Sequence, residues 1–506
     1  MESALPAVTA HLPAFLPAQR WFGGKERAIE RVEIRDTAVI PDHPSSLLAI
    51  VDVFSVGDAV PATYFVPLGL AASEQATGPG EIVARHGELL VRDAIGDPTT
   101  CRALLRGMLD GQTLTTAQGG RFLFQPVRRQ PTVAPPGPSS VDAMALAVRH
   151  AGVEQSNTSV IFGSTFILKA LRRLATGTNP EIEIPRFLGE HTTFDRVPAL
   201  VGWAEYRAPD GSSAPVAVLQ GFVENAGDGW SHVLRAVSGI TLGDARGESR
   251  AAVLVDEIAA LGRTLGALHL ALASCPDIPD FTPEPIDEAD IERWRLRTHA
   301  SLDDVLARVA HGVQGGPAGT GWSAANRTLA RRVRDGADRL RAAIDGIAVL
   351  ADGVTVKTRH HGDFHLGQTL VAPDGWMLID FEGEPLRSLK ERRAKQTPLR
   401  DLAGLLRSLD YARATAERQA DSTPVAAIFD RCRAALLQAY VETVRAGGAP
   451  LLPARPGDLR RVLLALETEK ALYELTYELG NRPDWVAIPL GALARLAQDE
   501  DAARGG

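Results

Sequence analysis

The chain has 506 residues, of which 45% are hydrophobic and 23% are charged, so its composition is that of a globular protein with room for two or three domains. Its 54 Lys and Arg residues against 62 Asp and Glu residues give a formal net charge of -8, which argues against a protein that binds nucleic acid through the phosphates. The three cysteines are far apart and form no CxxC pair, which argues against a disulfide framework or a thiolate zinc site.

The sequence gives no sign of a membrane segment. Residues 1–17 lack a basic region and contain three prolines, and no later apolar run reaches about 18 residues. We therefore expect a cytoplasmic protein in a reducing compartment, with no membrane or nucleic-acid partner.

The first part of the chain is predicted to be rich in β-structure. Apolar and β-branched runs alternate with turn residues in a pattern typical of an antiparallel meander, followed by one helix and one further strand. The expected strands cover residues 47–56, 63–70, 88–95 and 120–127, and the expected helix covers residues 101–109. The proline-rich run 131–138 should end this part, so residues 1–130 are predicted to form a first domain.

A second β-rich part, residues 131–223, is predicted to lead into a helical part, residues 224–506. Two strands should form a hairpin around Gly163, and two more strands should follow, at residues 159–162, 165–171, 200–207 and 216–223. Apolar residues then recur at helical spacing in four segments, residues 251–272, 326–347, 425–445 and 458–479. This order predicts an α+β protein.

The most informative motif is HGDFHLGQ at residues 361–368, which is followed by DFE at residues 380–382. Phosphoryl transfer depends mainly on positioning and electrostatics, and it needs a carboxylate beside the acceptor hydroxyl and oxygen ligands for a metal that bridges the phosphates. Asp363 fits the first role, and Gln368 with Asp380 fits the second. The chain between them predicts a hairpin, residues 369–371 and 376–379, that would bring Gln368 and Asp380 together.

Other polar residues near this motif have simpler interpretations. His360, His361 and His365 suggest a metal site by spacing, but the glycine and aspartate among them favour a loop in which imidazoles bond to neighbouring groups. Asp401 is interpreted as a carboxylate at a helix N-terminus or as a brace of the active site, and the brace is favoured. The glycine cluster 312–321 lacks the ending of a P-loop and is predicted to be a surface loop.

Together these motifs resemble the actinobacterial maltokinases and the related glucosamine kinases. QRWFGGK at residues 19–25 and the segment from Tyr473 to Pro483 resemble the same family, so the resemblance runs from end to end. It implies a bilobal protein-kinase-like fold, similar to that of aminoglycoside phosphotransferases, with an N-terminal β-rich cap subdomain and a mostly helical C-terminal lobe. It also implies the use of ATP and Mg²⁺, with residues 131–223 binding the nucleotide.

The resemblance further implies a set of nucleotide contacts. Lys169 would pair with the nucleotide phosphates and with Glu183. Glu181 is an alternative to Glu183 as the carboxylate partner of Lys169. Where protein kinases carry a glycine-rich loop, this chain has no GxGxxG but the polar residues Asn157, Thr158 and Ser159. The segment 219–223 resembles the hinge that meets adenine, through Gln220, Phe222 and Val223; a buried edge strand without a ligand is an equal alternative.

The acceptor site is less clearly marked. Glu474 and Glu478 lie four residues apart on a predicted helix, where like charges repel unless a cation offsets them. The simpler and favoured hypothesis is that Lys470 pairs with Glu467 or Glu474. The alternative is that Glu474 and Glu478 bind the sugar together with Tyr477 and Trp485, beside Asp363 and His361, and such a carboxylate pair would favour an amino sugar.

We therefore expect an ATP- and Mg²⁺-dependent sugar kinase that converts glucosamine to glucosamine 6-phosphate. The alternatives are a maltokinase that makes maltose 1-phosphate, an antibiotic phosphotransferase and a catalytically dead kinase-like binding module. The joint presence of four residues argues against a dead binding module, which would not need the full set: Lys169, Asp363, Gln368 and Asp380. The partner is expected to be a small-molecule sugar; the sequence does not decide the oligomeric state, and a monomer is compatible with it.

Overall fold

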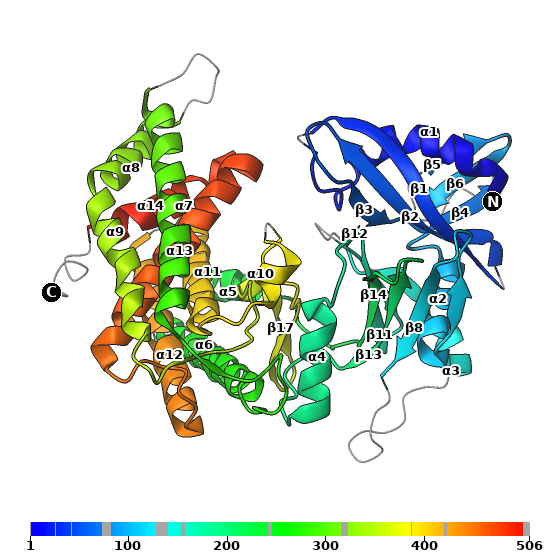
Figure 1. The fold of residues 1–506 in the computed structure, drawn as a ribbon. Coiled ribbons are helices and arrows are strands. Elements are labelled where there is room, and N and C mark those ends of the chain that lie inside the picture. The colour runs from blue at the N-terminus through cyan, green and yellow to red at the C-terminus, as the bar shows by residue number, and fades with distance from the viewer. Residues whose placement is uncertain are drawn as a thin grey trace. The chain divides into compact units, whose positions relative to one another are not determined.

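The computed structural model describes residues 2–25, 27–41, 43–72, 82–127, 140–152, 157–240, 245–314, 322–385, 387–418 and 422–498. Their contacts group the chain into two compact units, Met1–Glu190 with Val197–Glu224 and His191–Arg196 with Asn225–Gly506. The first unit carries the two large sheets and the second is mainly helical (Figure 1). The predicted α+β class is confirmed, whereas the division at residues 130 and 223 stays a prediction.

The first unit begins with a short helix and an antiparallel seven-stranded sheet. Helix α1 (Leu5–Phe15) precedes the strands, which are β1 (Ile29–Ile40), β2 (His43–Ser55), β3 (Ala62–Phe65), β4 (Leu68–Ala72), β5 (Ile82–His86), β6 (Leu89–Asp93) and β12 (Arg173–Leu174). The order is β12-β3-β2-β4-β6-β5, with β1 paired to β2. The predicted antiparallel strands are present, but the single strand expected over residues 63–70 is divided into β3 and β4, both of which pair with β2. Sequence analysis also missed β1, whose charged residues and register shifts interrupt the alternation.

The second sheet of this unit contains the predicted hairpin. Its strands are β7 (Thr113–Thr115), β8 (Arg121–Pro126), β9 (Val148–His150), β10 (Asn157–Phe162), β11 (Phe166–Leu171), β13 (Leu200–Arg207) and β14 (Ser213–Gly221), in the order β7-β8-β13-β14-β11-β10-β9. Gly163 turns the hairpin between β10 and β11 with a φ of 57°, a conformation that glycine adopts without strain. The proline-rich run 131–138 lies outside the described residues.

Two apolar cores hold the first unit together. Helix α2 (Pro98–Asp110), with Asp97 as its N-cap, packs with both sheets around buried side chains such as Phe65, Phe122 and Phe162. Helix α1 covers the other core, where Val8 and Leu12 meet residues of the first sheet. Two further helices belong to this part of the chain, α3 (Ser140–Met144) and α4 (Pro180–His191). Apolar burial on both sides thus fixes the first sheet.

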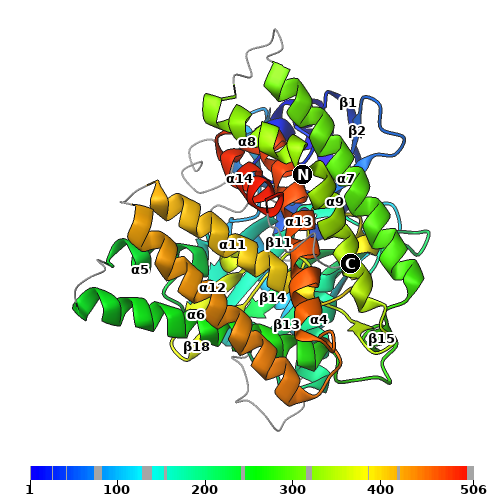
Figure 2. The same cartoon turned by 90° about the vertical axis from the view of Figure 1, so that its left-hand side faces the viewer.

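The second unit is built mainly from helices. Their bounds are α5 (Gly229–Ser238), α6 (Ala245–Leu272), α7 (Glu288–Gln314), α8 (Ala324–Asp335), α9 (Ala337–Asp345), α10 (Leu389–Arg393), α11 (Leu399–Glu417), α12 (Ser422–Gly447), α13 (Pro456–Asn481) and α14 (Ala487–Leu496). Long helices α6 and α12 lie side by side (Figures 1 and 2). No helix of the described residues is long and apolar enough to cross a membrane.

Two helix predictions need correction. The single segment expected over residues 326–347 is divided at Gly336 into α8 and α9. A Cβ atom at Gly336 would lie 2.5 Å from that of Ala497, so the break allows a close approach to the end of α14. Residues 312–314 of the expected glycine loop belong to α7, and residues 315–321 lie outside the described part of the chain.

Two small antiparallel pairs complete the second unit. Strand β15 (Glu284–Pro285) pairs with β16 (Val356–Lys357), and β17 (Thr369–Ala372) pairs with β18 (Gly375–Leu378). The second pair is the hairpin predicted from the sequence. It connects the HGD motif directly to the DFE motif.

Candidate active site

The side chain of Asp401, a buried carboxylate, fixes the backbone of the HGD loop. Asp401, in the first turn of α11, accepts hydrogen bonds from the backbone amides of His361 and Gly362 at 2.7 and 2.9 Å, and its Oδ2 lies 3.0 Å from His269 Nε2. Burial opposes ionisation, yet the adjacent His360 and the hydrogen bond to His269 keep the pKa of Asp401 well below its usual range. Asp401 is therefore both a residue of the helix N-terminus and the brace that the sequence favoured.

His361 and His365 make hydrogen bonds and ring contacts with residues of the HGD loop and of the segment around the DFE motif. His361 is buried, its Nε2 donates to the carbonyl of Ile379 at 2.9 Å, and its ring lies 5.0 Å from that of Phe364 and 4.6 Å from that of Phe381. His365 Nδ1 accepts from the amide of Gly367. No cluster of three or more metal-ligating His, Cys, Asp or Glu side chains occurs among the described residues. The expected loop interpretation agrees with this geometry, and the substrate contact predicted for His361 stays a prediction.

The hairpin brings Gln368 and Asp380 together, as predicted. The amide of Ile379 donates to the carbonyl of Gln368 at 3.0 Å, and Gln368 Nε2 donates to Asp380 Oδ2 at 2.8 Å. Among the described residues, Asp380 is the one non-glycine residue in the left-handed region, with φ of 67°. Such strain persists where the surroundings fix a residue, and it often marks functional sites. An amide oxygen and a carboxylate side by side match the hard oxygen ligands that Mg²⁺ prefers.

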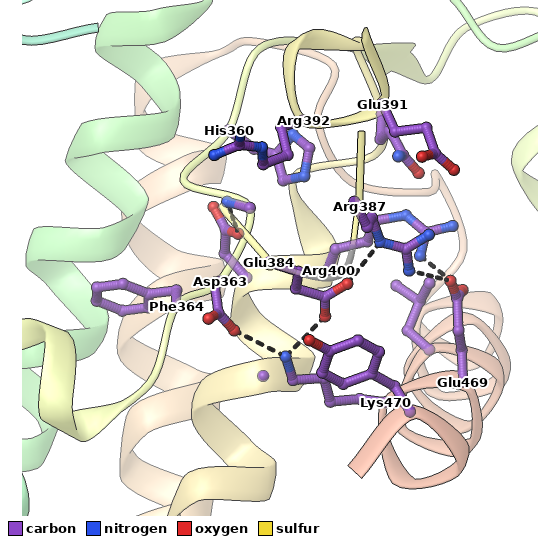
Figure 3. A pocket seen from close by; sticks show the side chains of 16 residues that line it. His360, Asp363, Phe364, Glu384, Arg387, Glu391, Arg392, Arg400, Glu469 and Lys470 are labelled. Carbon is purple, nitrogen blue, oxygen red and sulfur yellow. Dashed lines mark hydrogen bonds and ion pairs between the residues drawn. The ribbon is translucent and has the colours of Figure 1, made fainter. Parts of the chain in front are cut away.

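Asp363 lies in a polar pocket and faces a lysine of α13. Lys470 Nζ is 2.9 Å from Asp363 Oδ1 and 2.8 Å from Glu384 Oε1, and Figure 3 shows it between the two carboxylates. Burial would raise the pKa of Asp363, but the Lys470 ammonium outweighs it and holds that pKa below the usual value. The expected pairing of Lys470 with Glu467 or Glu474 is therefore wrong, because the lysine extends to the catalytic loop.

In the wall of this pocket, the partly exposed carboxylate of Glu469 is surrounded by arginines. Glu469 lies 2.8 Å from Arg297. It also lies 3.4 Å from Arg387 and 2.6 Å from Arg400 (Figure 3). Burial opposes its ionisation, but the guanidinium groups, that of Arg400 first, lower the pKa of Glu469 to about 2. Arg387 also pairs with Glu384 at 2.5 Å, so the guanidinium groups and carboxylates of this wall compensate one another.

Two side chains of the wall have unused hydrogen-bonding atoms. Arg400 uses Nη1 for Glu469, but its buried Nε and Nη2 have no partner among the described residues. Oε1 of the buried Gln396 also lacks one in that part of the chain. Both residues line the pocket that contains Asp363. Since unpaired buried polar atoms are costly, these atoms suit a polar ligand.

The two glutamates of α13 that were predicted to bind the sugar form ion pairs with arginines. Glu474 Oε2 is 2.6 Å from the buried Arg407, and Glu478 pairs with Arg482 and accepts from Tyr411 at 3.3 Å. A cation does offset each carboxylate, as the charge argument required. Burial, the largest effect, raises the pKa of Glu474 although Arg407 opposes it.

The aromatic members of that set lie beside these ion pairs. Trp485 stacks on Tyr411 with ring centroids 6.4 Å apart, and Arg482 covers the rings of both Tyr477 and Trp485. None of Glu474, Tyr477, Glu478 and Trp485 is among the described residues that line the Asp363 pocket. Their sugar-binding role stays a prediction.

Sequence analysis missed several residues that α13 contributes to the pocket. Leu466, Glu469, Lys470 and Tyr473 line it, and their spacing of three, four and seven residues places them on one helical face. That spacing is visible in the sequence. Which face of the helix meets the HGD loop is not, because the sequence carries polar residues on both.

The predicted nucleotide residues lie in the first unit. Lys169 on β11 pairs at 3.5 Å with Glu181, the competitor of Glu183, both of which lie in the first turn of α4. Ser159 is directly opposite Lys169 in the β10–β11 ladder. The nucleotide-binding roles of Lys169, Glu183 and Ser159 stay predictions.

The remaining nucleotide candidates lie on the same sheet. Asn157 and Thr158 begin β10, and Gln220 near the end of β14 is opposite Ile167. The amide of Phe222 donates to the carbonyl of Thr165 at 2.9 Å, and Val223 follows it. Adenine binding by this segment stays a prediction. The alternative, an edge strand, is wrong, because β14 pairs with β11 on one side and with β13 on the other.

Known proteins are similar to this chain in sequence and fold. Residues 15–97 match the model of the maltokinase N-terminal cap domain. Glucosamine kinase of Mycolicibacterium smegmatis is 29% identical over 353 residues, which are 69% of this chain and 79% of that protein. Glucosamine kinase of Streptacidiphilus jiangxiensis is 28% identical over 347 residues, 67% of this chain and 70% of that protein.

Solved structures extend the likeness over nearly the whole chain. A glucosamine kinase structure has a TM-score of 0.65 at 22% identity and covers 98% of this chain and 99% of its own. Another, in complex with glucosamine, ADP and inorganic phosphate, has a TM-score of 0.64 at 22% identity, covering 97% and 98%. The fold is thus kinase-like with an N-terminal cap. The resemblance to the family of glucosamine kinases and maltokinases, inferred from the motifs, is confirmed.

Proposed function

We propose that this protein is an ATP-dependent sugar kinase that phosphorylates glucosamine to give glucosamine 6-phosphate. The observation that carries the proposal is the Asp363 carboxylate, kept ionised in a polar pocket by Lys470 and fixed by a loop that Asp401 braces. The glucosamine kinases that resemble the chain over most of their length support this acceptor.

In the proposed reaction, polar side chains of the second unit have distinct roles. Lys470 donates to Oδ1 of Asp363, and Oδ2 would accept the hydrogen bond of the acceptor hydroxyl. The acceptor oxygen forms a bond to the γ-phosphorus, the bond from that phosphorus to the ADP oxygen breaks, and Asp363 receives the hydroxyl proton. Gln368 and Asp380 would hold Mg²⁺, which offsets the negative charge of the phosphates when bound.

The acceptor would meet the polar wall of the pocket. Within the described part of the chain, Arg400 Nη2 is a donor and Gln396 Oε1 an acceptor without a partner, and sugar hydroxyls can both donate and accept. The proposal retains Glu474, Tyr477, Glu478 and Trp485 as further sugar contacts, with the glutamates favouring an ammonium group. The matched cap domain gives maltokinase activity as a second candidate.

A panel of acceptors tests the proposal. The protein is incubated with ATP and Mg²⁺ and with glucosamine, N-acetylglucosamine, glucose, maltose or an aminoglycoside, and sugar phosphate and ADP are quantified. A hydrogen bond to a charged group contributes about 1.5 to 3 kcal/mol, so glucosamine should be preferred over glucose by roughly tenfold or more. Efficient use of maltose would favour the maltokinase alternative, and no transfer to any sugar would defeat the proposal.

The glutamates of α13 are tested separately. Glu478→Gln and Glu474→Gln should reduce kcat/KM for glucosamine more than for glucose, by roughly tenfold in the ratio, because the amide loses attraction to the ammonium. Glu474→Gln also leaves the buried Arg407 with less charge compensation, so thermal unfolding is measured for each variant. Equal losses on both sugars would remove these residues from the acceptor site and leave the kinase assignment intact.

A further inference from the structure

Glu384 lies two positions after the DFE motif and lines the pocket that contains Asp363, but the reaction described above gives it no role. It directly follows Gly383, whose φ of 76° is a left-handed conformation that favours glycine. A Cβ atom at Gly362 of the HGD loop would lie 3.4 Å from the Cα atom of Gly383. The backbone that bears Glu384 is therefore packed directly against the catalytic loop.

The buried carboxylate of Glu384 has a separate cationic partner for each of its oxygens. Its Oε1 accepts from Lys470 Nζ at 2.8 Å, and its Oε2 accepts from Arg387 Nε at 2.5 Å. Arg387 in turn lies 3.4 Å from Glu469. Arg387 thus holds Glu384 at one oxygen while Glu384 binds Lys470 with the other.

Lys470 has two carboxylate partners that fix its ammonium group. Its Nζ is 2.9 Å from Asp363 Oδ1, and Figure 3 shows it between Asp363 and Glu384. A lysine side chain is long and flexible, so one contact fixes it less well than two. Burial disfavours the ammonium form, but Asp363 and then Glu384 hold the pKa of Lys470 well above its usual value. The two carboxylates therefore keep Lys470 both charged and in place.

The hydrogen bonds of Glu384 require a carboxylate at this position. Both of its oxygens face donors, so the amide NH₂ of a glutamine would face Lys470 Nζ or Arg387 Nε, donor against donor. An aspartate would keep the charge, but with the backbone fixed its side chain is too short to keep both contacts. A neutral isostere at Glu384 should therefore release Lys470 from one of its two anchors.

We propose that Glu384 is a positioning residue for phosphoryl transfer, acting through Lys470 on Asp363. It holds the ammonium of Lys470 at Oδ1 of Asp363, and this contact keeps the carboxylate oriented so that Oδ2 accepts from the acceptor hydroxyl. The inference rests on the proposed function, since it takes Asp363 as the group that receives the hydroxyl proton. Misplacement of Asp363 should slow the chemical step more than it weakens substrate binding.

The hold of Glu384 on Lys470 is tested without substrates. Glu384→Gln leaves Lys470 paired with Asp363 and Arg387 paired with Glu469, so the variant should fold. The rate at which an acetylating reagent modifies Lys470 is measured by mass spectrometry. Loss of Glu384 frees the lysine and lowers its pKa, so modification should be about threefold to tenfold faster. An unchanged rate would overturn the inference, whether or not any sugar is phosphorylated.

Kinetics then show whether this position of Lys470 matters for catalysis. With the sugar that the unmodified protein phosphorylates best, kcat of Glu384→Gln should fall by about 10- to 100-fold, the effect of a misplacement near 1 Å. KM for ATP and KM for the sugar should stay within about threefold of their normal values. Normal kcat, or a lower melting temperature with normal kcat, would show a merely structural role and overturn the inference.

A double variant tests whether Glu384 acts through Lys470. Glu384→Gln combined with Lys470→Met should be no slower than Lys470→Met alone, because both changes act on the same contact with Asp363. The double variant removes one charge of each sign, so it still tests the inference if Glu384→Gln does not fold. Additive losses of kcat would overturn the inference.

Glu284→Gln is the matched control. Glu284 of β15 also pairs with two lysines, Lys357 and Lys395, but none of these three is among the described residues that line the Asp363 pocket. This variant should leave both kcat and the modification rate of Lys470 unchanged. A failure of the unmodified protein to phosphorylate any sugar would overturn the proposed function, whereas the modification rate of Lys470 would still decide whether Glu384 holds this lysine.

Discussion

Asp363 shows how one residue's surroundings prepare it for chemistry. A buried carboxylate is normally driven toward the neutral form, which could not take up the proton of the acceptor hydroxyl. Here the ammonium of Lys470, 2.9 Å away, keeps the pKa of Asp363 low, and Glu384 shares the same lysine. The carboxylate is thus ready to accept from a hydroxyl at neutral pH.

Replacement of this carboxylate tests its role directly. Asp363→Asn should fold and bind nucleotide but lose roughly 10²-fold to 10⁴-fold in kcat, the usual range for a positioned acid or base. Turnover and nucleotide affinity are measured side by side. Asp374→Asn, at the exposed turn of the neighbouring hairpin, is the control and should retain activity. Near-normal turnover of Asp363→Asn would remove it from the mechanism.

Lys470 should determine the acidic limb of the pH profile. Lys470→Met removes the cation that lowers the pKa of Asp363, so burial then acts unopposed by this charge and that pKa rises. The acidic limb of kcat should move to higher pH, and kcat at pH 7 should fall. Lys470→Arg retains the positive charge and should move the limb less. An unshifted limb in Lys470→Met would show that another group titrates there.

At the scale of elements, the active site depends on a close approach of helix α11 to the HGD loop. A Cβ atom at Gly404 of α11 would lie 2.6 Å from the carbonyl oxygen of Phe364. Asp401, one turn earlier on α11, holds the amides of His361 and Gly362. The helix therefore fixes the loop both by a hydrogen-bonding carboxylate and by the absence of a side chain.

Gly404→Ala should displace the loop. The added methyl group forces the helix and loop apart, which should destabilise the protein by about 1 to 3 kcal/mol. A shift near 1 Å can cost about 10²-fold in rate, so kcat should fall markedly even where the variant is folded. Thermal unfolding and kcat are measured together. Gly457→Ala on α13, where a Cβ meets nothing within 4 Å, should be neutral or slightly stabilising. Equal behaviour of the two variants would contradict the argument.

For the whole molecule, each unit has its own source of stability. The first unit contains two apolar clusters and the buried Arg172–Asp93 ion pair. The second unit combines the ion pairs of the largely buried Glu469 with an apolar cluster of α7, α8, α9, α13 and α14. Breaking a buried pair by removing one partner is strongly destabilising, because the other charge is left uncompensated. The polar pocket and the stability of the second unit therefore depend on the same residues.

The stability of the protein should fall in acid partly through Glu469. Its pKa is lowered to about 2 from an ordinary value near 4.5, so its contribution is present above pH 4.5 and is lost as the pH falls toward 2. Glu469→Gln should lower stability at pH 7 by about 3 to 5 kcal/mol and show a shallower decline between pH 4.5 and pH 2. Denaturant unfolding over this range measures both effects. Asp304→Asn, which breaks an exposed pair with Arg308, should change neither by more than about 1 kcal/mol. A parallel decline in Glu469→Gln would assign the acid sensitivity elsewhere.

The sequence by itself determined the features that depend on near neighbours. The hairpin and the approach of Gln368 to Asp380 join residues only 12 positions apart, and local turn and strand signals suffice to place them. The β10–β11 hairpin and the amphipathic course of α6, α12 and α13 were predicted for the same reason. Local preference and apolar periodicity act over a few residues.

Only the tertiary structure decided which polar face meets the catalytic loop. Lys470 pairs with Asp363, 107 positions away in the sequence, and Arg407 pairs with Glu474, 67 positions away. Apolar periodicity identifies the buried face of α13. It does not show which charged residue next to that face meets the catalytic loop, because Glu467, Lys470 and Glu474 all lie close to it. The charges that pair are set by how the helices pack, since the free energy of an ion pair depends on distance and burial and not on separation along the chain.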